Sequence, residues 1–321
     1  MKKKNQELYE PYLIEVADLF NKSKTEKNPA YWLYLNKARV PLFMLESITR
    51  LVYKATNDPI AKKWTRFFKK LEDTLGELDY YDVFIKQFKT NRSVKKEQIN
   101  YLTNKLNKAM EKWNDKLRRK KFYSDHFHEF RNKATTDFNN TALLIRLHEQ
   151  IKTEILLTEQ FFSKHPNGFR DFEEEVHAMR RKLRWISIYG ISLGGIVVLK
   201  DNRQKYPWEK EFITKTETES KYNKLPVKKG LPYHIALNKK AFYALSHVID
   251  KLGVIKDKGL AIEALEKSLE KTNNSAQANA RVYATRQLKL SESEGLLLKE
   301  AYDLAYKFFV DYRIHIELMN V

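Results

Sequence analysis

Apolar side chains recur every three to four residues along most of the chain, which is the spacing of one face of an α-helix. This spacing predicts a long series of helices joined by polar connections. Their expected ranges are 6–24, 29–56, 59–75, 79–90, 93–121, 136–164, 169–200, 235–252, 258–271, 276–290 and 292–318. No stretch shows the regular strand alternation that a large sheet would need, so the predicted fold class is all-α.

Helix starts and breaks organise these segments. Asn28-Pro29 places a capping side chain before a proline, which favours the start of a helix. Pro166-Asn167-Gly168 is the sharpest break, and it predicts two helical bundles, 1–165 and 166–321. The polar stretch 201–230 lacks sustained periodicity, so we expect a loop or an insertion there in the second bundle.

Composition excludes several classes of protein. The chain has nine glycines and eight prolines among 321 residues, too few for the frequent turns of a β-sandwich or barrel. It has no cysteine, which excludes disulfides, thiol catalysis and cysteine-ligated zinc. We expect no metal site and no cofactor.

The charge balance points to an anionic partner. Sixty Lys and Arg face 41 Asp and Glu, a formal charge of +19, which favours nucleic acid, a membrane surface or a polyphosphate-like polymer. The basic start Met1–Lys4 is followed by polar residues, and the longest near-apolar run, Ile186 to Leu199, is too short to span a bilayer. These features predict a cytoplasmic protein without a membrane span, and they leave the oligomeric state open.

Cations gather on one face of each of three predicted helices. A polyanion presents repeated charges, and a stripe of Arg and Lys is the matching binding surface. Most charged helix faces are simply solvated, and this alternative stays open for each stripe. The candidate polyanion-binding residues are Lys62, Arg66 and Lys69; Lys105, Lys108, Lys112, Lys116 and Arg119; and His177, Arg180, Arg181 and Arg184.

Two segments of the chain look related to each other. Arg39 is followed after 36 residues by Leu75-Gly76, and Arg180 is followed after 72 residues by Leu252-Gly253. We expect each Leu-Gly to end a helix, with an acidic residue leading into the next one. The difference of 36 residues is about the size of the polar stretch 201–230, so an internal duplication is predicted.

At these residues the sequence resembles the CHAD domain (conserved histidine α-helical domain) family. The run from His177 to Arg184 is similar to the family's His-x-x-Arg motif and the basic residues after it. Leu75-Gly76 with Asp82, and Leu252-Gly253 with Asp257, are similar to its later motif. The resemblance covers nearly the whole chain. It implies two pseudo-symmetric helical bundles around a basic groove or pore, and binding of inorganic polyphosphate with no known catalytic step.

The first half departs from the family pattern. Asn36 stands at the position of the histidine, while Phe43, Met44 and Glu46 stand where further basic residues would follow. Arg39 is retained and stays a candidate for polyanion binding. We expect Glu46 to repel a polyanion, so that the second half binds more strongly.

Other motifs carry little weight. The run Glu217–Lys221 reads Glu-x-Glu-x-Lys, a motif of triphosphate tunnel enzymes, but this stretch has no room for their β-barrel. The two histidines of His126-Phe127-His128 diverge by about 200° on a helix, so a shared metal is not expected. The function predicted is non-catalytic binding of inorganic polyphosphate or a similar polyanion. The alternatives are an RNA- or DNA-binding protein, and a scaffold whose ligand site has decayed.

Overall fold

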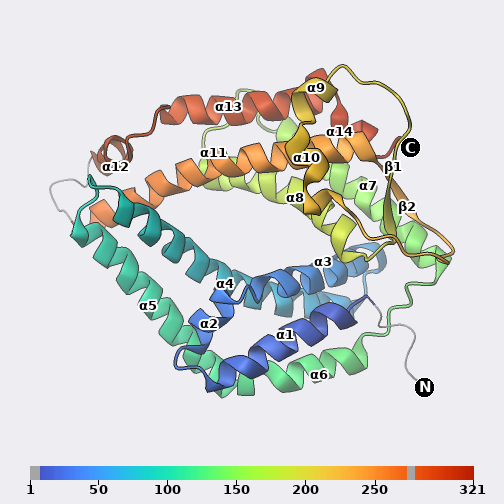
Figure 1. Cartoon of the computed structure of the whole chain (residues 1–321), viewed down its shortest axis with the longest axis horizontal. Helices are drawn as coiled ribbons and strands as arrows, with labels where there is room; N and C mark the ends of the chain where they lie inside the picture. The colour runs from blue at the N-terminus through green and yellow to red at the C-terminus, as the bar shows by residue number, and fades with distance from the viewer. Residues whose placement is uncertain (1–7, 273–278) are drawn as a thin grey trace. The chain divides into compact units, whose positions relative to one another are not determined.

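The computed structural model describes residues 8–272 and 279–321, and within these ranges it consists of helices with one pair of short strands (Figure 1). The predicted all-α class is confirmed. The chain divides into two compact units that interleave along the sequence and do not coincide with the predicted bundles. The described residues of Met1–Tyr53, Asn57–Thr136 and Ala261–Ser291 form the first unit, and Lys54–Thr56, Asp137–Leu260 and Glu292–Val321 form the second.

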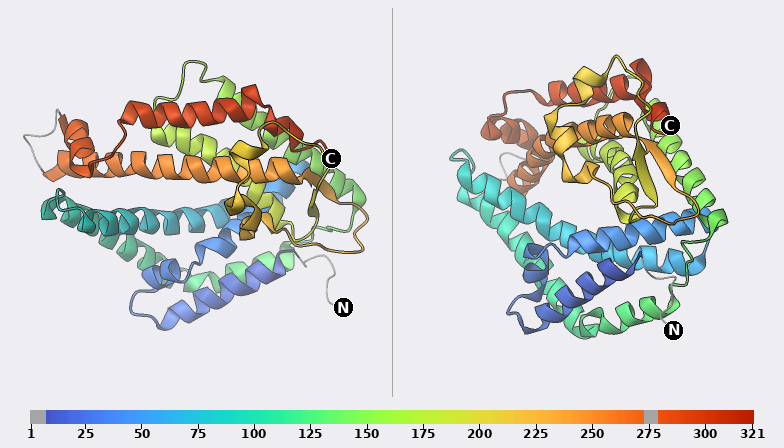
Figure 2. Two further views of the ribbon diagram at one scale, coloured as in Figure 1. Left: turned by 45° about the horizontal axis from the view of Figure 1, so that its top comes forward. Right: turned by 45° about the vertical axis from the view of Figure 1, so that its right-hand side comes forward.

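The first unit is built around the hairpin of two long helices, α4 and α5, which lie side by side (Figures 1 and 2). Helix α2 packs against both of them, and α1 packs along α6. The rings of Trp64, Phe68 and Phe130 meet in the core at centroid distances of 5.0 to 6.1 Å. Its helices are α1 (Glu10–Lys22), α2 (Pro29–Leu35), most of α3 (Arg39–Thr56), α4 (Pro59–Thr90), α5 (Lys96–Arg119), α6 (Ser124–Lys133), α12 (Ala280–Leu288) and the end of α11 (Lys239–Thr272).

The second unit surrounds the first part of α11. A π-helical turn, Phe172–His177, leads directly into α8, which packs against α7. Strands β1 and β2 pair in parallel, with Val197 opposite Ile235. Its elements are α7 (Thr141–Ser163), α8 (Ala178–Ser192), β1 (Val197–Lys200), α9 (Glu209–Phe212), α10 (Lys215–Glu219), β2 (Ile235–Asn238), α11 as far as Leu260, α13 (Glu294–Tyr306) and α14 (Ile314–Glu317).

Side-chain caps fix several helix starts where the sequence predicted them. The carboxamide of Asn28 accepts a hydrogen bond from Tyr31 N at 3.2 Å, and the carboxylate of Asp58 accepts one from Ile60 N at 2.8 Å. Each cap satisfies a backbone N–H that has no partner inside its helix. The proline that follows each cap begins the helix.

The predicted helix boundaries need correction at several places. Range 29–56 is two helices, because Lys37 adopts a left-handed backbone with φ 58° between α2 and α3. The predicted helix 169–200 ends at Ser192 and gives way to β1. Helix α6 was not predicted at all. Part of the predicted helix 276–290 lies outside the described residues.

The most informative correction concerns the two Leu-Gly motifs. Neither ends a helix, because α4 and α11 each run without interruption through their glycine. A glycine inside a helix costs about 1 kcal/mol relative to alanine. Its presence in both long helices therefore points to a close approach by another group.

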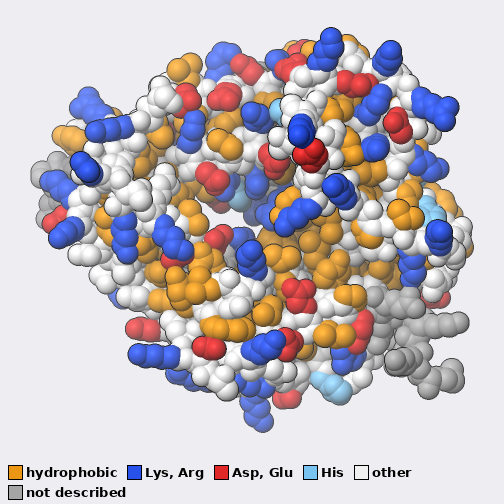
Figure 3. Space-filling model, viewed as in Figure 1, with side chains coloured by type: hydrophobic (Ala, Val, Ile, Leu, Met, Phe, Trp, Pro, Cys, Tyr) orange, Lys and Arg blue, Asp and Glu red, His pale blue; other side chains and the backbone are white. Residues whose placement is uncertain are grey.

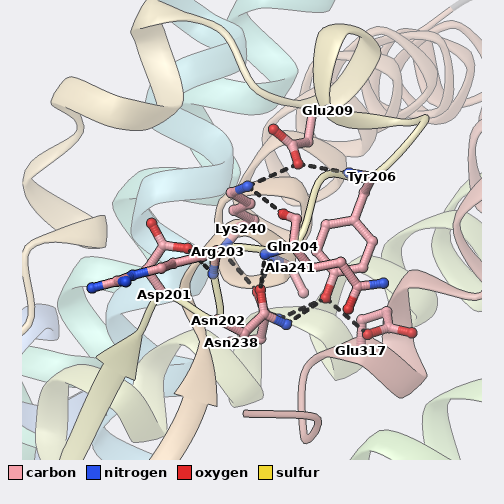
Figure 4. A network of polar contacts seen from close by, with 10 residues as sticks. All are labelled: Asp201, Asn202, Arg203, Gln204, Tyr206, Glu209, Asn238, Lys240, Ala241 and Glu317. Carbon is pink, nitrogen blue, oxygen red and sulfur yellow. Dashed lines mark hydrogen bonds and ion pairs between the residues drawn. The ribbon is translucent and has the colours of Figure 1, made fainter.

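The polar stretch 201–230 is an ordered insertion rather than a bare loop. It carries α9 and α10, and Trp208 and Phe212 are buried. The side chain of Asn238 caps α11 and also donates to Tyr206 Oη at 3.1 Å. Tyr206 in turn donates to Glu317 at 3.0 Å, so the insertion is tied to the start of α11 and to α14 (Figure 4).

Over the described residues, no helix combines the length and the apolar character needed to cross a membrane.

Close packing at Gly259 gives a testable consequence. A Cβ placed there would lie 2.1 Å from the Phe172 ring, which is fully buried. We expect Gly259→Ala to lower the free energy of unfolding by ~1–3 kcal/mol, as overpacked cores do. Gly295 near the start of α13 has open space around it, so Gly295→Ala should raise stability by ~0.5 kcal/mol. Urea denaturation of both variants measures the difference, and equal stabilities would contradict the packing at Gly259.

Candidate polyanion-binding sites

Two of the three predicted cationic stripes meet in a cavity of the first unit. The cavity has a volume of about 300 Å³ and lies between α4 and α5. We call it the α4–α5 cavity. Its lining residues are Arg66, Lys69, Lys70, Asp73, Thr74 and Glu77 of α4, and Ala109, Lys112, Trp113 and Lys116 of α5.

Most cations of the α4–α5 cavity are not neutralised. Lys69 forms an ion pair with Asp73 at 2.6 Å. Arg66, Lys70 and Lys112 have no ion-pair partner among the described residues. Partial burial, followed by the charges of Lys70 and Lys112, lowers the pKa of Lys116. These groups repel one another, and an anion between them would relieve that repulsion.

The remaining members of these two stripes lie outside the cavity. The Lys62 ammonium lies 5.2 Å from the centre of the Tyr53 ring, and the Lys105 ammonium lies 5.5 Å from that of Tyr101. Lys108 and Arg119 are exposed on α5. Figure 3 shows that acidic side chains are interspersed with Lys and Arg on the viewed face, so basic stripes alone do not define a site.

The third stripe forms a separate cluster in the second unit, which we call the His177 cluster. It comprises His177 at the end of the π-helical turn, Arg180, Arg181 and Arg184 of α8, and Lys256 of α11. Burial and then the four neighbouring cations lower the pKa of His177 to about 4. The imidazole is therefore neutral near pH 7, and its Nδ1 is buried without a hydrogen-bond partner. The sequence reasoning missed Lys256, which lies one turn after Gly253.

Arg180 explains the glycine in α11. A Cβ at Gly253 would lie 2.9 Å from Arg180 Nε, so an alanine would displace the guanidinium. Arg180 Nε donates to the backbone carbonyl of Ile249 at 2.9 Å. Burial lowers the pKa of Arg180, and the carboxylates of Asp257 and Asp250 act in the opposite direction. No carboxylate of the described residues lies within ion-pair distance of this guanidinium.

Arg39 has a closely similar environment in the first unit, with one decisive difference. A Cβ at Gly76 would lie 3.0 Å from Arg39 Nη2. Arg39 Nε donates to Glu72, and Nη1 forms an ion pair with Asp79 at 3.1 Å. Arg39 is thus neutralised by two carboxylates of α4. Counted from the glycine, the residues that correspond to Glu72 and Asp79 in α11 are Ile249 and Lys256.

An aromatic residue completes the likeness between the two environments. Tyr31 precedes Arg39 by eight residues, and its hydroxyl donates to Asp82, six residues after Gly76. Phe172 precedes Arg180 by eight residues, and its ring covers Gly259, six residues after Gly253. The same positions are therefore in contact in both units, through a polar pair in one and an apolar pair in the other.

Glu46 does not have the role that the sequence predicted. Its side chain is 2% exposed, so it does not present a charge on the surface of α3. Burial, followed by the charge of Glu72, raises the pKa of Glu46 to about 8. The carboxyl is mostly protonated near pH 7, and the expectation that it repels a polyanion is wrong. The charge of Arg39 is instead neutralised by the carboxylates of Glu72 and Asp79.

The structure gives no function to the Glu-x-Glu-x-Lys run or to the pair His126 and His128. Glu217 belongs to the short helix α10, where it closes a capping box with Thr214, so the Glu-x-Glu-x-Lys run is not a strand of a tunnel. Among residues 8–272 and 279–321, no three His, Asp or Glu side chains are grouped so that they could hold a metal ion.

Comparisons with protein-family models, with curated proteins and with solved structures find no match for this chain. The resemblance to the CHAD family stays a prediction from short motifs.

The buried carboxyl of Glu46 predicts a pH-dependent stability. Its pKa in the folded state is about 8, above its value of about 4.5 in an unfolded chain. The folded state therefore holds this proton more tightly, and the resulting stability is lost as pH rises from about 4.5 toward 8. We expect the free energy of unfolding to fall by on the order of 3 kcal/mol from this group between pH 5 and 8.

Glu46→Gln should remove that fall, because an amide does not titrate. Urea denaturation at a series of pH values measures it, with the exposed Glu77→Gln as the matched control. An unchanged pH profile in Glu46→Gln would show that Glu46 is not the titrating group.

Proposed function

We propose that this protein binds inorganic polyphosphate or a similar polyanion without catalysing a reaction on it, chiefly through the His177 cluster. The observation that carries the proposal is that no carboxylate of the described residues pairs directly with Arg180, on which Asp257 and Asp250 act only from beyond ion-pair distance. In the first unit two carboxylates neutralise Arg39, whereas Ile249 and Lys256 take the corresponding positions of α11, and Lys256 is itself paired with Asp257 at 2.5 Å. Partly buried cations without carboxylate partners are stabilised by an anionic ligand.

An internal duplication accounts for the paired environments, and we infer one. Tyr31 and Arg39 correspond to Phe172 and Arg180, both with an offset of 141 residues. Residues of the two long helices correspond with an offset of 177, for example Gly76 to Gly253. The 36 additional residues fall between α8 and α11, where the second unit carries its insertion. This supports the resemblance to the CHAD family, whose members carry two similar halves.

Single-stranded nucleic acid is the first alternative ligand, and it has a structural requirement of its own. Binding of single strands uses aromatic rings on which bases stack. Tyr101 is a ring beside the α5 stripe that could stack a base, and Lys105 lies over it. The binding measurements described below also test the other alternative, a scaffold protein whose ligand site has decayed.

The ligand class is tested by competition. We expect long-chain polyphosphate to displace any bound RNA, and its affinity to fall steeply with salt because bound counterions are released. Fluorescence anisotropy with labelled polyphosphate at several salt concentrations measures both effects. If RNA of matched charge bound more tightly than polyphosphate, nucleic acid would become the proposed ligand. If a neutral polymer bound equally well, the proposal of polyanion binding would be wrong.

The two units should differ in their contribution to binding. Charge-assisted contacts to phosphate contribute roughly 1.5–3 kcal/mol each when partly desolvated. Arg180→Ala/Arg184→Ala should therefore weaken polyphosphate binding at least about tenfold. Lys112→Ala/Lys116→Ala should have an intermediate effect. Arg39→Ala should have the smallest effect on binding, because Glu72 and Asp79 already neutralise this guanidinium.

Affinities are compared at one salt concentration, after circular dichroism has shown that each variant folds. Arg39→Ala as the most damaging change would contradict the asymmetry. Unchanged affinity in all three variants would mean that these faces are merely solvated, and the scaffold alternative would then be preferred.

A further inference from the structure

The charges of the α4–α5 cavity are not spread evenly along it. Arg66, Lys69 and Lys70 of α4 and Lys112 and Lys116 of α5 are its cations. Lys70, Lys112 and Lys116 line the cavity together, and burial, followed by the charges of Lys70 and Lys112, lowers the pKa of Lys116. Because α4 and α5 form a hairpin, Arg66 and Lys70 lie toward the same end as Lys116. One end of the cavity is therefore strongly basic.

The opposite end is acidic. Asp73, Thr74 and Glu77 follow the cations along α4, and they line the cavity together with Ala109 of α5. Asp73 is held by Lys69, whereas Glu77 has no ion-pair partner among the described residues. From Arg66 to Glu77 the helix rises by about 16 Å. A polyanion running along this cavity would bring its charges against the free carboxylate of Glu77.

A small ligand with two different ends fits this arrangement better than a polymer. The cavity volume of about 300 Å³ lies at the small end of the range for sites that hold small molecules. Lys and Arg bind phosphate groups. A carboxylate accepts hydrogen bonds from sugar hydroxyls, as the acidic residue of dinucleotide sites does for ribose.

We propose that the α4–α5 cavity binds a small molecule with phosphates at one end and hydroxyls at the other, as in nucleotides and sugar phosphates. The phosphates lie among Arg66, Lys70 and Lys112, and Glu77 accepts hydrogen bonds from the hydroxyls. The inference shares with the proposed function the premise that this cavity binds phosphate, and it narrows the ligand.

The test uses calorimetric titration of the full chain with ATP, glucose 6-phosphate, inorganic tripolyphosphate and long-chain polyphosphate. The wild-type protein should bind ATP more tightly than tripolyphosphate, which carries the charge without the hydroxyls. Glucose 6-phosphate shows whether a sugar and one phosphate are enough for binding. If it bound more tightly than ATP, the ligand class would be sugar phosphates. Lys70→Ala/Lys112→Ala should weaken ATP binding by about tenfold.

The decisive variant is Glu77→Ala. It should weaken ATP binding about fivefold through the lost hydrogen bond, while tripolyphosphate binding stays equal or becomes tighter because a repulsive charge is gone. Glu111→Ala removes an exposed carboxylate of α5 that does not line the cavity, and it should leave ATP binding unchanged. Tighter binding of both ATP and tripolyphosphate to Glu77→Ala, or equal affinities of the wild-type protein for the two, would overturn the proposal.

Failures of the two proposals are distinguishable. Binding of long-chain polyphosphate that depends on Arg180 and Arg184, without binding of ATP or glucose 6-phosphate, would sink this inference and leave the proposed function. Binding of ATP that depends on Glu77, without binding of long-chain polyphosphate, would do the reverse.

Discussion

A guanidinium packed against a helix backbone organises each unit of this protein. The contact requires a glycine in the interior of a long helix, because a Cβ at Gly76 or Gly253 would meet the arginine within about 3 Å. The glycine weakens its own helix by about 1 kcal/mol. In return the arginine reaches the residue one turn before the glycine, and its Nε bonds there in both units. The contact thereby fixes which positions of the long helix face the arginine.

The residues around this contact decide whether the arginine is structural or available to a ligand. In the first unit Nε bonds to the Glu72 side chain, so the positive charge is matched by carboxylates. In the second unit Nε bonds to a backbone carbonyl, which satisfies the donor but does not neutralise the charge. Removing a guanidinium from water without a counter-charge is costly. An anionic ligand that supplies the counter-charge would offset this cost. This is the physical argument for proposing that the second unit binds the polyanion.

Much of the fold could be predicted from the sequence, because helix periodicity and caps are local signals. The apolar spacing gave the all-α class, and Asn28 and Asp58 start helices where capping chemistry places them. The helices α4 and α11 were divided wrongly, since a glycine reads as a helix end when the group packed against it is unknown. That group comes from another helix, and its approach is a tertiary fact.

The candidate sites were predictable to a similar extent. The stripes of α4 and α5 were visible as periodic charges, and the hairpin brings four of their candidates, Arg66, Lys69, Lys112 and Lys116, to one cavity. The protonation state and the ion-pair partners of each charged side chain could not be predicted from the sequence. Glu46 lies seven residues after Arg39, so a helical projection puts both on one face. In the fold Glu46 is buried and mostly protonated, whereas Arg39 is paired with acids 33 and 40 residues away in sequence.

His177 is the titratable group at the centre of its cluster, and its imidazole is neutral near pH 7. Burial is the first cause and the positive charges around the ring are the second, and both favour the unprotonated imidazole. A phosphate group placed among Arg180, Arg184 and Lys256 would offset part of that positive field. The pKa of the imidazole would then rise, while burial would still act in favour of the neutral form. Under the proposed function, proton uptake at His177 and polyanion binding are therefore linked.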